Sequence, residues 1–152
     1  MIVPDLAERC RLVAATCAAT RIRQAARVVS QHYDAVMRRS GLVRTQFTVL
    51  VASALAGPAG VPMSALARIL VLDRTALTRT LAPLERAGWV RAARSASDSR
   101  VRLVRITAAG TRRLARALDL WEEAQASFQA RAGADWPETH ARLGRVVQAL
   151  TS

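Results

Sequence analysis

Two short amphipathic segments, separated by about three residues, constrain the fold of this chain more than any other feature. Residues 64–70 and 73–87 each repeat apolar side chains at helical spacing. In the second segment Leu77, Leu81 and Leu84 make up the apolar face. Two helices joined by so short a turn are typical of the helix-turn-helix motif.

A β-hairpin is predicted directly after this pair of helices. The runs 89–94 and 101–106 are rich in β-branched and apolar residues, and they flank the polar segment 95–100. A hairpin in this place is the wing of a winged helix-turn-helix. A short extended piece is expected at 61–63, ahead of the first helix of the pair.

The segment before this unit reads as one long helix over 5–38. Asp5 and Glu8, directly after Pro4, form a capping signal, and Gly41 is expected to end the helix in a left-handed conformation.

Capping residues also mark where the other helices are expected to begin. Two helices are expected near the C-terminus, at 108–132 and 136–150, with Gly133 between them. The pattern therefore predicts a mainly α fold with a small β-wing. The expected caps are Thr45, Ser64, Asp73 and Thr107.

The charge of the chain is strongly basic and unevenly placed. There are 23 Lys+Arg against 11 Asp+Glu, a net charge of +12, and every cation is an arginine. Most of the excess falls in residues 68–116, whereas residues 117–152 carry more acids than arginines. Such a field implies a polyanionic partner, with nucleic acid first and a membrane surface second.

Other classes of protein are disfavoured by what the sequence lacks. It contains no Gly-rich phosphate loop and no H-E-x-x-H, and its histidines, His32 and His140, stand far apart, so we expect no enzyme, cofactor or metal site. No apolar run is long enough to span a bilayer, and we expect no membrane partner. Two cysteines cannot make a disulfide framework, which favours a reducing, cytoplasmic setting.

The second helix of the pair carries a candidate base-reading surface opposite its leucines. Arg74, Thr75, Thr78 and Arg79 share much of that face, in the half of the helix that enters the major groove in helix-turn-helix docking. Arginine can bind guanine with two hydrogen bonds, and threonine can contact base edges or a thymine methyl. A solvated amphipathic helix with ordinary arginines would show the same residues.

The wing adds a second basic surface. Arg94 and Arg100 flank its turn, and an arginine at the tip of a wing can enter a narrow minor groove. Asp98 is expected to hold the guanidinium of Arg100 by an ion pair, although an exposed pair of this kind contributes little by itself.

Together these stretches resemble the MarR family of winged-helix transcription regulators. The resemblance follows the order and spacing of the chain from 44 to 116, and the flanking helices fit in length. It is carried by TQFTVL (45–50), MSALA (63–67), LDRTALTR (72–79), LERAGWV (84–90), DSR (98–100) and ITAAG (106–110).

The resemblance implies a homodimer in which the first and the last two helices of each chain interleave. It gives a winged helix-turn-helix DNA-binding domain at 41–107 and a helical dimerisation region at 1–40 and 108–152. The last helices, which carry Trp121, Phe128 and Trp136, are also too apolar for an exposed arm. The predicted DNA-binding residues are Ser64, Arg74, Thr75, Thr78, Arg79, Arg86, Arg94, Asp98, Arg100 and Arg112.

The resemblance further implies an effector pocket where the dimerisation helices meet the winged domain. Each candidate for its lining can equally be core or solvated surface. The candidates are Arg27, His32, Tyr33, Phe47 and Trp121.

Cys17 is a candidate redox residue, because one branch of the family senses peroxide through a cysteine in the first helix. Cys10 and Cys17 would lie about 10 Å apart along one helix, too far to bridge within a chain. The sequence favours a small buried apolar role for Cys17 over a redox one.

The function expected is that of a homodimeric, sequence-specific transcription regulator of the bacterial cytoplasm, which binds a palindromic operator in double-stranded DNA. Repressors released by a small ligand or oxidant are the commonest type in the family. The alternative is a non-specific basic protein that shapes DNA or binds anionic surfaces. The effector, the operator and the sense of regulation stay open.

Overall fold

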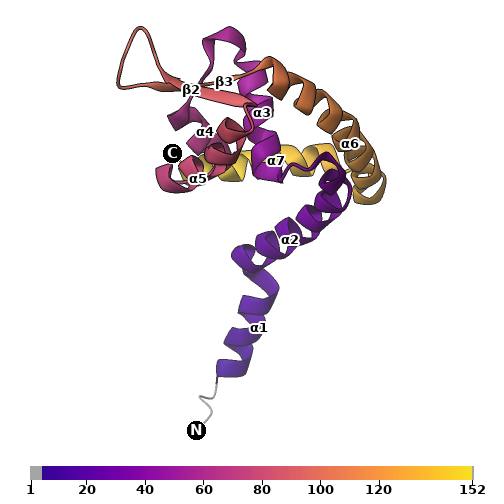
Figure 1. Ribbon diagram of the computed structural model, residues 1–152. Helices are drawn as coiled ribbons and strands as arrows, with labels where there is room; N and C mark the ends of the chain where they lie inside the picture. The colour runs from indigo at the N-terminus through magenta and orange to yellow at the C-terminus, as the bar shows by residue number, and fades with distance from the viewer. Residues whose placement is uncertain (1–4, 152) are drawn as a thin grey trace.

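The computed structural model of the chain describes residues 5–151 and is mainly helical, with one three-stranded antiparallel sheet (Figure 1). Residues 1–4 and 152 of the expected dimerisation region, Pro4 of the capping signal among them, lie outside the described residues. The elements are α1 (Leu6–Thr16), α2 (Ala18–Met37), η1 (Arg38–Ser40), α3 (Arg44–Leu55), η2 (Gly57–Ala59), β1 (Val61–Pro62), α4 (Met63–Leu70), α5 (Arg74–Arg86), β2 (Val90–Arg94), β3 (Arg102–Ile106), α6 (Ala108–Ala132) and α7 (Trp136–Thr151).

The single helix predicted over 5–38 is wrong, because the backbone breaks at Cys17. That residue has an extended conformation (φ −66°, ψ 103°) between α1 and α2. The hydroxyl of Thr16 donates to the carbonyl of Leu12 (2.8 Å), a contact that bends helices. Asp5 also makes no side-chain capping bond. Gly41 does adopt the predicted left-handed conformation (φ 66°).

The two helices of the predicted helix-turn-helix are α4 and α5. Asp73 caps α5 as predicted, since its carboxylate accepts the Ala76 N–H (2.8 Å). Two of the other three expected caps are wrong, each by two residues, since the residues at the cap positions are Val43 and Pro62. Thr45 lies inside α3, which begins at Arg44, and Ser64 lies inside α4.

The predicted hairpin is confirmed as β2 and β3, paired from Val90 with Ile106 to Arg94 with Arg102. The extended piece before α4 forms β1, which pairs with β3 through Val61 and Val104. The sheet therefore has the order β1-β3-β2, and its central strand connects the wing to the base of the helix-turn-helix.

The hydrophobic core lies between α3, α4, α5 and the sheet, and it also takes in residues from outside 41–107. Met37 at the end of α2 and Leu114 and Ala117 of α6 are buried in the same cluster. The winged unit is therefore continuous with the two long helices. Its fully buried side chains include Val49, Leu50, Leu66, Leu77, Leu84, Val90 and Val104.

A tight backbone contact fixes the start of α6 against the turn between α5 and β2. The Thr107 N–H donates to the carbonyl of Trp89 (3.0 Å), and its hydroxyl donates to the carbonyl of Gly88 (2.6 Å). The Thr107 oxygen also accepts the Gly110 N–H (3.1 Å), which confirms the predicted cap. A Cβ on Gly110 would lie 2.0 Å from the Trp89 oxygen, so only glycine fits.

We call α1, α2, α6 and α7 together the arm; α1 and α2 lead away from the winged unit, with α1 at the far end, and α7 runs back from the end of α6 (Figure 1). Here α2 packs along α6, where His32 Nε2 lies 3.0 Å from the carbonyl oxygen of Ala124 and the Tyr33 hydroxyl donates to Gln125. No residue of α1 or α7 is buried. Within the described residues, no helix has both the length and the apolar character needed to cross a membrane.

We predict that Gly110→Ala lowers the free energy of unfolding by about 1–3 kcal/mol, because the added methyl group must displace the Trp89 carbonyl that holds Thr107. Ala108→Gly, an exposed change in the same helical turn, should cost no more than about 1 kcal/mol. Urea unfolding of both variants measures the difference. Equal losses would show that the contact at Gly110 does not constrain the fold.

Candidate nucleic-acid interface

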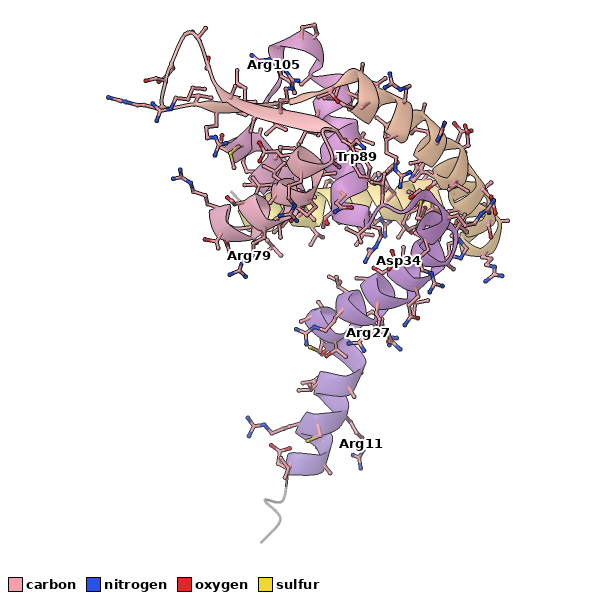
Figure 2. The ribbon with its side chains drawn as sticks, viewed as in Figure 1. Arg11, Arg27, Asp34, Arg79, Trp89 and Arg105 are labelled. Atoms are coloured by element: carbon pink, nitrogen blue, oxygen red, sulfur yellow. The ribbon has the colours of Figure 1, made fainter. Side chains whose placement is uncertain are left out.

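The exposed face of α5 displays the four residues selected from its sequence. Leu77, Leu81 and Leu84 point into the core, and the opposite face is left to solvent. Figure 2 shows Arg79 projecting outward from α5. The exposed residues are Arg74, Thr75, Thr78 and Arg79.

The hydroxyl of Thr78 is already engaged as a donor within α5. It donates to the carbonyl of Arg74 (2.8 Å), which leaves its oxygen lone pairs and its methyl group for a ligand. Thr78 can therefore accept a hydrogen bond or cover an apolar group, whereas Arg79 is a donor only.

The wing turn is held by Asp98, but not in the way predicted. The expected ion pair with the guanidinium of Arg100 is absent, and the carboxylate instead accepts the backbone N–H of Arg100 (2.9 Å). A short Asx-type bond closes a turn locally, whereas an exposed ion pair would have to immobilise a long side chain. The guanidinium of Arg100 consequently has no partner among residues 5–151.

A cavity of about 310 Å³ brings together three predicted residues from three different elements. Ser64 comes from α4, Arg74 from the first turn of α5 and Arg100 from the wing. Its apolar side is formed by Met63, Ala67, Leu77 and Val101. Arg102 also lines it and was not selected, although it belongs to the same run of wing arginines.

The remaining predicted residues lie at the edges of this surface. Arg86 is exposed in the last turn of α5, about 10 Å along the helix axis from Arg79. Arg94 is exposed at the end of β2, and Arg112 is exposed in the second turn of α6.

Only some of the arginines that the structure describes are held by carboxylates. Within residues 5–151, ion pairs join Arg39 to Glu123, Arg44 to Asp34 and Arg142 to Glu138, and all lie on the arm or at its junction. None of the predicted DNA-binding arginines forms one. In the wing, Arg105 (Figure 2) donates to the carbonyl of Pro58 (2.8 Å) and so serves the fold.

The five candidate effector residues lie in different surroundings. His32 and Tyr33 pack against each other and against Phe128, and burial raises the pKa of the Tyr33 hydroxyl. Phe47 and Trp121 pack on the core. Arg27 lines a separate shallow hollow on α2.

A larger hollow, of about 610 Å³, lies where the end of α2 meets α3 and the end of α4. Arg44 crosses this junction, donating to Asp34 (2.8 Å) and to Ser30 (2.6 Å). Its lining combines apolar and charged side chains, a composition that the sequence pattern could not reveal because it draws on three separate segments. The lining residues are Asp34, Arg38, Leu42, Val43, Arg44, Thr45, Thr48, Ile69 and Leu70.

Cys17 occupies the N-cap position of α2, and both it and Cys10 are free thiols. The hydroxyl of Thr20 donates to its sulfur (3.3 Å) and, with backbone N–H groups of the first turn, lowers the pKa of the Cys17 thiol. Among the described residues, no three His, Cys, Asp or Glu side chains are grouped as a metal site would require.

Comparison with known proteins finds the same architecture in transcriptional regulators. The MarR family model matches residues 40–101. The transcriptional regulator MosR of M. tuberculosis, solved in complex with DNA, is 37% identical, with 90% of this chain and 97% of that chain covered and a TM-score of 0.77. No curated protein sequence matched the chain.

More distant structures share the fold. A mutant of E. coli MarR, complexed with operator DNA, is 23% identical, covers 89% of this chain and 96% of that chain, and has a TM-score of 0.75. The PcaV regulator of Streptomyces coelicolor, complexed with its natural ligand, is also 23% identical, covers all of both chains and has a TM-score of 0.76. With the wing, the helix-turn-helix and the close match to MosR, the chain belongs to the MarR family.

Proposed function

We propose that this protein is a homodimeric transcription regulator that reads a palindromic operator in double-stranded DNA. The observation that carries the proposal is the unpaired basic surface of α4, α5 and the wing. Its arginines have no carboxylate partner among the described residues, so they can neutralise phosphates without first breaking ion pairs. MosR and MarR, which share the fold, were both solved with DNA.

The composition of the α5 face favours sequence reading over phosphate binding alone. Phosphate contacts need only cations, yet Thr75 and Thr78 stand at the front of the helix beside Arg79. The wing adds Arg100, whose backbone is fixed by Asp98 while its guanidinium stays unpaired. Together they suit a helix in the major groove and an arginine in the adjacent minor groove.

Support for a dimer comes from the set of apolar side chains that a single chain leaves exposed along its arm. A monomer would expose them together to water, which soluble monomers avoid. A second copy with the same faces would bury them through the proposed 1–40 and 108–152 region. They include Leu6, Leu12, Val13, Ile22, Val28, Leu143, Val146, Val147 and Leu150.

We propose that an effector binds in the 610 Å³ junction hollow, rather than at the five residues selected from sequence, and thereby releases the protein from DNA. The hollow touches both α2 of the arm and α3 and α4 of the winged unit, so a ligand there would bias their relative position. PcaV, which shares the fold, was solved with its natural ligand. A repressor that such binding releases is the form of regulation we propose.

The test of the proposed function is selection of bound sequences from a random pool of duplexes. A regulator enriches one palindrome and discriminates it from scrambled competitors. The alternative, a non-specific basic protein, rests on the net charge of +12 and predicts no enrichment, with equal binding to any duplex or to anionic vesicles.

We predict that Arg79→Ala lowers the free energy of binding to the selected site by about 1–3 kcal/mol and relaxes the base preference at one base step of each half-site.

At the wing, Arg100→Ala should weaken binding to A·T-flanked sites most, and Asp98→Ala should give a milder form of that defect. Arg112→Ala should weaken all duplexes alike, and Arg116→Ala, an exposed change on α6 outside the predicted set, serves as the control. Binding to selected and scrambled duplexes across a salt series separates these effects. An equal loss on both duplexes for Arg79→Ala would favour the non-specific alternative.

We predict that Val147→Asp weakens the dimer at least about tenfold, because a charge would enter the apolar stripe of α7 once in each copy. Ala141→Asp adds the same charge to the opposite face of α7 and should leave the dimer intact. Sedimentation over a dilution series measures both. If both variants dimerise like the parent chain, α7 is not part of the interface.

We predict that Thr20→Val slows alkylation of Cys17 near neutral pH, because loss of the hydroxyl bond returns the thiol pKa toward its higher ordinary value and leaves less thiolate. The difference should disappear in alkaline buffer, where both thiols are ionised. Thr16→Val, whose hydroxyl contacts only the backbone, is the control, and all proteins carry Cys10→Ser. Equal rates at neutral pH would show that Thr20 does not activate the thiol.

A further inference from the structure

Arg113 of α6 stands out among the cations that the structure describes because part of its guanidinium is buried but not hydrogen-bonded. Its Nε is buried without an acceptor among residues 5–151, and it forms no ion pair there. Buried polar groups normally find partners, so an arginine left in this state is not explained by hydrogen bonding.

The guanidinium of Arg113 contacts two other parts of the chain. Its Cζ lies 4.9 Å from the centre of the Trp89 ring, a cation–π contact. A Cβ added at Gly41 would lie only 2.4 Å from the terminal nitrogen of Arg113 and 3.7 Å from its Cζ, so Gly41 lies beyond the tip of the guanidinium. The arginine therefore occupies a slot in which its head group packs on the indole ring and its tip meets a bare stretch of backbone.

The three residues of this slot belong to parts of the chain with different tasks. Gly41 follows η1, which ends the arm helix α2. Trp89 joins α5, the proposed reading helix, to β2. Arg113 lies on α6, which is fixed to Trp89 at its start and packs along α2 farther on. The slot is thus a joint between the winged unit and the arm.

We propose that Arg113 is a positioning residue that sets the angle between the winged unit and the arm, and through it the distance between the two reading helices of the dimer. The effect on the distance between the two reading helices rests on the proposed function. Half-sites one helical turn apart require a fixed distance between the reading helices, and the joint lies between each helix and the dimer surface.

The chemistry of the slot explains why arginine is needed. A guanidinium is planar, weakly hydrated and able to stack, so it fills a narrow gap with one orientation. Lysine would bring a charge without a plane, and methionine would bring volume with free rotation. Arg113→Lys and Arg113→Met therefore both loosen the joint, while Arg116→Met, an exposed change one turn away, does not.

The joint is tested first without DNA, by spin labels on Arg68→Cys of α4 and Gln31→Cys of α2, in a Cys10→Ser, Cys17→Ser background. Both labelled positions are exposed, and dilution with unlabelled chains confines the distance to one chain. We expect Arg113→Met and Arg113→Lys to broaden or shift the distance distribution at an unchanged thermal midpoint, and Arg116→Met to reproduce the parent distribution. A parent-like distribution in both Arg113 variants would overturn the proposal.

The consequence for DNA is tested with the selected operator and versions whose half-sites are one base pair closer or farther apart. Arg113→Met should lose about five- to tenfold of the parent's discrimination between spacings, while its preference for the selected half-site over a scrambled one stays within about twofold. Unchanged spacing discrimination would overturn the link between the joint and the dimer geometry. A parent protein that selects no sequence would instead overturn the proposed function, and the label distances would still decide whether Arg113 sets the joint.

Discussion

The contact between the start of α6 and the carbonyl of Trp89 is the constraint on which the rest of the structure depends. Thr107 and Gly110 hold the first turn of α6 against the turn that ends α5. Helix α5, the wing and the first turn of α6 are thereby held together, and Leu114 and Ala117 of α6 join the same core. Whatever moves the first turn of α6 must therefore move the end of α5 with it.

The ion pairs lie away from the basic surface. Carboxylates of α2 and α6 hold Arg44 of α3 and Arg39 of η1 in place, whereas the arginines of α4, α5 and the wing form no ion pair among the described residues. Exposed ion pairs add little stability, but unpaired cations gathered on one face create a field that attracts a polyanion. The fold thus gathers arginines without carboxylate partners on the surface that carries α5.

The parts of the fold that were predictable are those determined by neighbouring residues. Asp73 and Thr107 cap their helices, Gly41 turns left-handed and the hairpin forms because each depends on side chains within a few positions. The break at Cys17 was missed because the segment contains no glycine or proline. The bond from Asp98 to the Arg100 amide was missed because the sequence does not distinguish a side-chain from a backbone partner.

The candidate site was predictable only as a surface. Helical periodicity placed Arg74 and Arg79 on one face, but only the folded chain brings Ser64, Arg74 and Arg100 around one cavity. The slot that holds Arg113 joins residues far apart in the chain and has no local sequence signal. The junction hollow, for the same reason, contains none of the residues selected for an effector.

We propose that two copies of this chain present α5 to DNA as a symmetric pair. A hydroxyl-radical footprint on a selected duplex tests this arrangement. We expect two protected segments related by a two-fold axis and centred about one helical turn apart, with protection of the flanking minor grooves by the wings. A single protected segment, or uniform protection along the duplex, would contradict it.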